Sequence, residues 1–213
     1  MIKKFFLSSL FWLLIFLPQF IFGVDDFESW SSIGFEKKLP YSFSFSFKQG
    51  LRLKNQLATF KQTHSEGALS YQVFNNIKIE IPYRYIVYKD KIKQRLSISG
   101  SQKYNMKSFI LKHRIKYQMT SEIKETLEDL IRNKVYILYQ LNKRLEPFIS
   151  GEIFHFHEEA KYQFDEYRLT FGINIDFPKK QSFKISYMFK SEDLNKEISN
   201  QINIFAITYN YKW

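Results

Sequence analysis

The sequence predicts an all-β protein: a single antiparallel, up-and-down transmembrane β-barrel of about 10–12 strands. Three observations predict it. Apolar and polar side chains alternate along most of the chain, the alternating runs are long, and turn residues separate them. Side chains of a strand point alternately to opposite faces, so each run has one apolar and one polar face. Transmembrane strands need about 9–11 residues, whereas strands of soluble proteins average about 5–6.

The alternation is clearest in 41–53, 77–87 and 182–190. In the first of these, aromatic and leucine side chains share one face, while serine, lysine and arginine share the other. Helical spacing would scatter the same residues around the axis. We expect strands over residues 27–39, 41–54, 64–74, 77–89, 93–104, 107–119, 130–141, 146–157, 162–177, 181–191 and 200–213.

The connections predict how the strands are joined. Tight turns are expected at 39–40, 75–76, 104–106, 142–144 and 178–180, and longer links near 55–63, 89–93, 119–129, 157–162 and 191–200. Short turns that alternate with longer loops are typical of bacterial outer-membrane barrels, whose short turns face the periplasm. Such barrels normally have an even number of strands, so a count of eleven implies either a misdivided run or an unusual first strand.

One stretch has helical spacing. In 121–131, the residues Ile123, Leu127, Leu130 and Ile131 share one side of a helix. We expect a short helix within a loop there.

The first 23 residues predict a cleaved signal peptide. Lys3 and Lys4 precede an apolar run, Pro18 breaks it, and Gly23 supplies a small residue before Val24. The apolar run is shorter than the roughly 20 residues of a spanning helix, although an uncleaved anchor is the alternative. We therefore expect export to the bacterial cell outer membrane, with residues 24–213 forming the barrel.

Composition narrows the chemistry. The chain has no Cys, which excludes disulfides, thiol catalysis and Cys-ligated metals. Its net charge of +11 is compatible with anionic solutes, an acidic membrane surface or nucleic acid. Nucleic acid is not expected as a partner, because the basic residues are spread over many strands of an exported chain. The expected partners are outer-membrane lipids, the barrel-assembly machinery and small anionic solutes, and no cofactor is expected.

The C-terminal strand ends in an aromatic residue. An apolar face that closes on an aromatic terminus resembles the signal by which the bacterial barrel-assembly machinery takes up its clients, and here it consists of Phe205, Ile207, Tyr209, Tyr211 and Trp213. The alternative, an edge strand of a soluble sandwich, would expose five large apolar groups to aggregation.

If the apolar face meets lipid, the polar face lines the interior. The expected lumen residues are Arg52, Glu80, Arg84, Arg95, Arg114, Lys116, Arg132, Glu152, Glu166 and Arg168. Two interpretations stay open. One is an interior closed by salt bridges, in which Arg84, Arg132 and Arg168 pair with Glu80, Glu152 and Glu166. The other is a narrow anion-preferring pore whose selectivity is set by unpaired cations, above all Lys112, Arg114 and Lys116.

Two further functions are weighed. An outer-membrane hydrolase would need a site such as His155 and His157, which lie two apart near a predicted loop, but these point outward if Glu152 points inward. No catalytic or metal site is expected, and the chain is not predicted to be an enzyme. A soluble lipocalin-like barrel would instead turn the apolar face inward around a hydrophobic ligand.

Four stretches also carry a family resemblance: 27–39, 130–134, 145–154 and 164–172. In order and spacing they resemble the bacterial family called domain of unknown function 2490. The resemblance covers 27–213 and implies an exported outer-membrane β-barrel. It implies no particular activity, because the matching motifs are strand patterns and not catalytic signatures.

Overall fold

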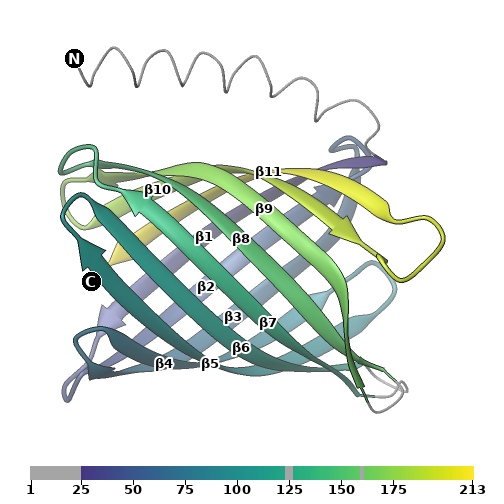
Figure 1. Cartoon of the computed structure of the whole chain (residues 1–213), viewed down its shortest axis with the longest axis horizontal. Helices are drawn as coiled ribbons and strands as arrows, with labels where there is room; N and C mark the ends of the chain where they lie inside the picture. The colour runs from purple at the N-terminus through teal and green to yellow at the C-terminus, as the bar shows by residue number, and fades with distance from the viewer. Residues whose placement is uncertain (1–24, 123–126, 159–160) are drawn as a thin grey trace.

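The computed structural model describes residues 25–122, 127–158 and 161–213, and it is a closed barrel (Figure 1). The predicted signal peptide lies outside the described residues. The strands are β1 (Asp26–Lys38), β2 (Phe43–Lys54), β3 (Thr59–Phe74), β4 (Ile77–Val87), β5 (Ile92–Met106), β6 (Phe109–Glu122), β7 (Glu128–Tyr139), β8 (Leu145–Glu158), β9 (Lys161–Phe177), β10 (Gln181–Glu192) and β11 (Asn200–Lys212). The predicted all-β barrel of ten to twelve strands is confirmed.

The barrel closes through one parallel pair. Successive strands pair antiparallel, but β1 pairs with β11 in parallel, in a register that sets Ser32 beside Thr208. The hydroxyls of these two residues lie 2.9 Å apart across the seam. An even strand count is required only when every neighbouring pair is antiparallel, so the parallel seam allows eleven. The strictly antiparallel sheet that we expected is wrong at this one pair.

The connections at the two ends of the barrel differ less in length than expected. One end carries the C-terminus and the turns 39–42, 75–76, 107–108, 140–144 and 178–180, and the described connections at the other end are 55–58, 88–91 and 193–199. Two of the expected long links, 55–63 and 157–162, are mostly strand, because β3 begins at Thr59 and β9 at Lys161. Left-handed backbone conformations at Asn55, Gln56 and Leu57 make the turn between β2 and β3 tight.

The predicted helix over 121–131 is wrong for the part that the structure describes. β7 begins at Glu128, and Leu130 is a buried interior residue paired with Phe156 of β8. β7 hydrogen-bonds to β6 on one edge and to β8 on the other, and this satisfies its backbone groups without a helix. Residues 123–126 lie outside the described residues. The described residues contain no helix long and apolar enough to cross a membrane.

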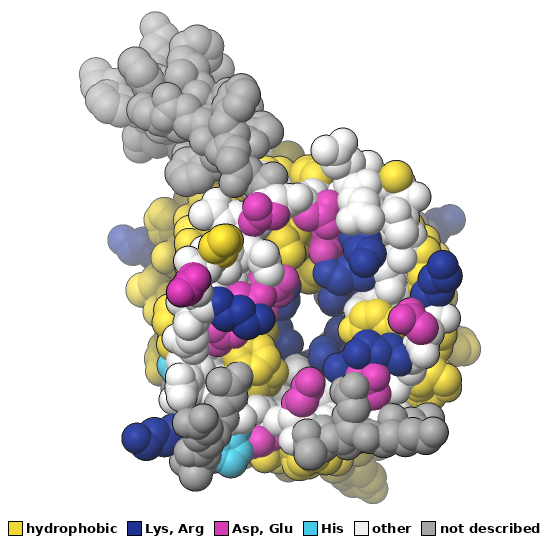
Figure 2. Space-filling model, turned by 90° about the vertical axis from the view of Figure 1, so that its right-hand side faces the viewer, with side chains coloured by type: hydrophobic (Ala, Val, Ile, Leu, Met, Phe, Trp, Pro, Cys, Tyr) yellow, Lys and Arg dark blue, Asp and Glu magenta, His cyan; other side chains and the backbone are white. Residues whose placement is uncertain are grey.

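The wall has an apolar exterior and a polar interior. Large apolar side chains such as Phe45, Ile81 and Ile98 are 46–50% exposed on the outside. Most of the buried interior side chains are polar, with Glu28 at 1% and Gln62 at 3% exposure. Figure 2 shows the end of the barrel hollowed at its centre, with Lys and Arg side chains around the hollow and apolar side chains at the periphery. A lipocalin-like apolar interior is therefore excluded for the described wall.

A glycine in this wall gives the first prediction. A Cβ on Gly172 would lie 2.5 Å from the carbonyl oxygen of Ile185 and 2.6 Å from the Phe148 ring. We expect Gly172→Ala to cost about 1–3 kcal/mol of unfolding free energy, since backbone cannot move aside cheaply. Heat unfolding of the detergent-solubilised barrel, followed by gel mobility or circular dichroism, measures the loss.

The matched control is Gly100→Ala in β5. A Cβ there meets nothing within 4 Å, so its unfolding temperature should stay at or above that of the natural chain. Equal losses for the two variants would contradict the packing seen at Gly172.

Candidate functional site

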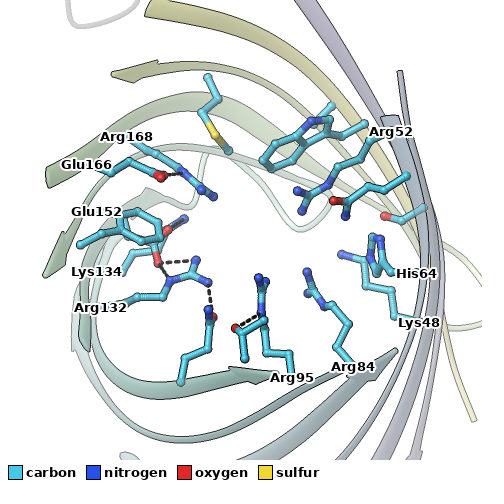
Figure 3. Close-up of a pocket in the computed structure, with 18 of the residues that line it drawn as sticks. Lys48, Arg52, His64, Arg84, Arg95, Arg132, Lys134, Glu152, Glu166 and Arg168 are labelled. Atoms are coloured by element: carbon cyan, nitrogen blue, oxygen red, sulfur yellow. Dashed lines mark hydrogen bonds and ion pairs between the residues drawn. The ribbon is translucent and has the colours of Figure 1, made fainter. Parts of the chain in front are cut away.

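The candidate site is a cavity of about 330 Å³ in the lumen, crossed by charged side chains from both sides (Figure 3). The expected lumen residues that line it are Arg52, Arg84, Arg95, Arg114, Arg132, Glu152, Glu166 and Arg168. Glu80 and Lys116 lie on the interior faces of β4 and β6, outside the set that lines the cavity. The structure therefore brings most of these side chains into one compartment, while their functional roles remain predictions.

Glu152 is the centre of the ion-pair network on one side of the lumen. Its side chain is only 2% exposed, and three cations converge on it. The Oε1 atom accepts from Arg114 at 3.0 Å and from Arg132 at 2.8 Å, and Oε2 accepts from Lys134 at 3.2 Å. Arg114 and Lys134 face each other across β6 and β7, so this carboxylate compensates like charges that the register brings together.

Two of the three expected interior pairs are present, and the third is wrong. Arg132 pairs with Glu152 and Arg168 with Glu166, which also lies 3.8 Å from Lys190. Arg84, however, pairs at 2.7 Å with Glu66, its direct neighbour on β3.

Glu80 pairs instead with Lys78, at 3.3 Å. Glu80 and Arg84 lie four residues apart on β4, and a strand rises about 3.3 Å per residue, which is too far for side-chain contact.

The opposite side of the lumen, on β2 to β5, carries cations with fewer acidic partners. Arg52 stacks on the Trp30 ring, with Cζ 3.6 Å from the ring centroid, and Arg95 donates from Nε to the Thr120 hydroxyl at 3.2 Å. Within the part of the chain that the structure describes, neither has a carboxylate partner. Arg114, which we expected among the unpaired cations, is bound to Glu152. Among the described arginines that line the cavity, the two without a carboxylate partner are therefore Arg52 on β2 and Arg95 on β5.

Sequence reasoning missed two interior residues. The indole of Trp30 lines the cavity and donates to Glu28 Oε2 at 2.7 Å. The alternation could have indicated this position, because Trp30 and Glu28 lie two residues apart on one strand and therefore point to the same face. His64 is 5% exposed and lies over Gly50, where a Cβ would come within 2.3 Å of its Cε1 atom. This contact follows from the cross-strand register alone, so no local pattern indicates it.

His155 and His157, the histidines considered for catalysis, lie on the outer wall, as predicted from their alternation with the inward-pointing Glu152. The ring of His155 packs against that of Phe164, with 5.9 Å between the ring centroids. His157 Nδ1 lies 3.0 Å from Asp129 Oδ1, and the Tyr162 hydroxyl donates to the other oxygen of Asp129 at 2.7 Å. This group lies near the end at which β7 begins. The described residues contain no cluster of three potential metal ligands.

The C-terminal residues lie on the outside of β11. Phe205 and Ile207 are 39% and 38% exposed, and Trp213 is 72% exposed. The backbone N–H of Trp213 donates to the Glu36 carbonyl at 2.7 Å, which extends the seam to the last residue. Recognition of Phe205, Ile207, Tyr209, Tyr211 and Trp213 by the assembly machinery stays a prediction.

The Glu152 network gives the second prediction. We expect Glu152→Gln to lower the unfolding free energy by about 3–5 kcal/mol, because three cations would lose a buried carboxylate. Glu80→Gln is the control, since Glu80 has one half-exposed partner and should cost under about 1 kcal/mol. Urea unfolding in detergent micelles measures both variants. Indistinguishable midpoints would contradict the role of Glu152.

Comparison with solved structures places the fold among known barrels. The NanC porin superposes with a TM-score of 0.52 at 9% identity, covering 77% of this chain and 86% of that one. A bacterial polysaccharide outer membrane secretin superposes with a TM-score of 0.52 at 8% identity, covering 79% of this chain and 63% of the other. At such identities the likeness concerns the fold alone.

Sequence comparison identifies the family. No curated protein matches the chain significantly. The family model described as "Protein of unknown function (DUF2490)" matches residues 27–202, which include the lumen residues discussed above. The family resemblance drawn from the strand patterns is thereby confirmed, and the chain is a member of the DUF2490 family.

Proposed function

We propose that the protein is an integral outer-membrane β-barrel that forms a narrow pore preferring small anions. Its exterior supports the membrane location. A wall of large exposed apolar side chains would be an aggregation hazard in water but matches the hydrocarbon core of a bilayer. The barrel folds of the porin and the secretin described above agree with this location.

The observation that carries the proposed selectivity is the uneven compensation of charge across the lumen. On the β7 to β10 side, Glu152 pairs with Arg132 and Lys134, and Glu166 pairs with Arg168 and Lys190. Arg52 and Arg95 face the same cavity from β2 and β5 without a carboxylate partner among the described residues. Rings of Arg and Lys favour anions in a narrow pore, and the low-dielectric wall strengthens their field.

A closed structural barrel is the second candidate, and the Glu152 network favours it. Three cations that converge on one buried carboxylate hold side chains across part of the lumen. An eight-stranded barrel is just filled by its side chains, and eleven strands add limited room. A closed barrel would interact only with outer-membrane lipids and, during assembly, with the barrel-assembly machinery.

The third prediction separates the two candidates. In planar bilayers under a potassium chloride gradient, we expect single-channel currents whose reversal potential has the sign of chloride preference. Arg52→Glu combined with Arg95→Glu should bring the chloride-to-potassium permeability ratio to one or below, because the uncompensated charge changes sign. The absence of current in a folded preparation would favour the closed barrel.

The matched control is Arg144→Glu combined with Lys180→Glu. It makes the same change in net charge at two exposed turns. Its permeability ratio should stay close to that of the natural chain, and a loss as large as in the lumen variant would contradict selectivity set by Arg52 and Arg95.

A further inference from the structure

Two arginines face each other on the interior of the wall. Arg84 of β4 and Arg95 of β5 are direct cross-strand partners, and both line the cavity. Like charges directly opposite on neighbouring strands repel each other and destabilise a sheet. A fixed pair of this kind is tolerated best when an anion lies between the two guanidinium groups.

The carboxylates of the described residues provide only part of the negative charge that this arginine pair needs. The Oε2 atom of Glu66 accepts hydrogen bonds from both Nε and Nη2 of Arg84, at 2.7 Å each. Arg95 donates a hydrogen bond only from its Nε, to the neutral hydroxyl of Thr120. A guanidinium carries five N–H donors, so most of the donors of Arg95 remain available toward the cavity.

A third guanidinium is held in place by stacking. Arg52 packs on the face of Trp30, and Trp30 is itself fixed by its hydrogen bond to Glu28. A stacked guanidinium keeps its N–H donors at its edge, in the plane of the group. In Figure 3 the ends of Arg52, Arg84 and Arg95 all point into the same cavity.

We propose that Arg52, Arg84 and Arg95 form a binding site for a divalent oxyanion of the phosphate or sulfate type. The inference deepens the proposed pore function, on whose lumen it rests. Planar guanidinium groups bind tetrahedral oxyanions through pairs of parallel hydrogen bonds, which chloride cannot accept. A divalent anion also compensates the cations on the β2 to β5 side of the lumen. The site therefore distinguishes oxyanions from halides, which a merely positive pore would not.

Titration calorimetry of the folded full-length barrel in detergent tests the site, with inorganic sulfate as the probe and chloride at equal ionic strength as the reference. We expect saturable sulfate binding with one site per chain and a rise in the heat-unfolding midpoint that chloride does not give. No saturable binding, or an equal effect of chloride, would overturn the proposal.

Conservative variants test whether the geometry matters as well as the charge. Arg52→Lys and Arg95→Lys keep the charge but lose the planar fork, so each should weaken sulfate binding at least about tenfold, the equivalent of one lost charge-assisted hydrogen bond. Arg144→Lys on an exposed turn is the control and should bind as the natural chain does. Unchanged sulfate affinity in folded Arg52→Lys and Arg95→Lys barrels would overturn the site.

The source of the oxyanion is resolved by competition. Displacement of sulfate by glycerol 3-phosphate as well as by inorganic phosphate would support a site for organic phosphate esters. Displacement by inorganic phosphate alone would support a site for the free ion. Displacement by neither would overturn a phosphate-type site.

Sulfate binding and ion current test the oxyanion site and the pore separately. Sulfate binding in a barrel without ion current would support the site and refute the pore. A chloride-selective current that sulfate neither blocks nor slows, in a chain that does not bind sulfate, would support the pore and overturn the site.

Discussion

The parallel pairing of β1 with β11 is the constraint on which the interior depends. Because side chains alternate with a period of two, a slip of one residue at the seam would turn a whole strand inside out. The observed register places Ser32 beside Thr208 and Trp30 beside Ala206, so the polar face of β1 joins the interior. Glu28 and Trp30 thereby reach the lumen, where Trp30 packs against the small buried apolar cluster of Met188, Ile202 and Ile204.

The seam also separates two electrostatic environments. On one side, β6 to β10 form a network in which Glu152 and Glu166 each bind several cations. On the other side, Arg52 depends on aromatic stacking and Arg95 on a hydroxyl. A buried ion pair costs desolvation that only good geometry repays, and the cations bound to Glu152 and Glu166 have such a partner whereas Arg52 and Arg95 do not. The uncompensated side is where a mobile anion gains most.

Local pattern was sufficient for the strands and their faces. In β2 and β4 the alternation of large apolar and charged residues predicts both the strand and its exposed side, because burial on one face alone has a period of two. The family membership follows from the same strand patterns. The long links near 55–63 and 157–162 were overestimated, because polar residues at the barrel ends continue as strand beyond the apolar belt.

Pairing between strands could not be read from the sequence. The partner of Arg84 is Glu66 and not Glu80, because the register of β3 against β4 decides it. The helical spacing over 121–131 did not predict the structure of Leu130 and Ile131, because the hydrogen bonds that β7 makes on both of its edges favour a strand. The parallel seam joins residues more than 170 positions apart, as between Ser32 and Thr208, and no local signal indicates it.

The central claim is that the apolar face meets lipid while the charged face encloses water. The natural chain has no Cys, so single substitutions Phe45→Cys and Ser46→Cys provide neighbouring probes on opposite faces of β2. In proteoliposomes, we expect a fluorophore attached at position 45 to be quenched by nitroxide-labelled acyl chains. A small charged thiol reagent added in water should react at position 46 and spare position 45. The reverse pattern, or equal access from water at both positions, would contradict the account.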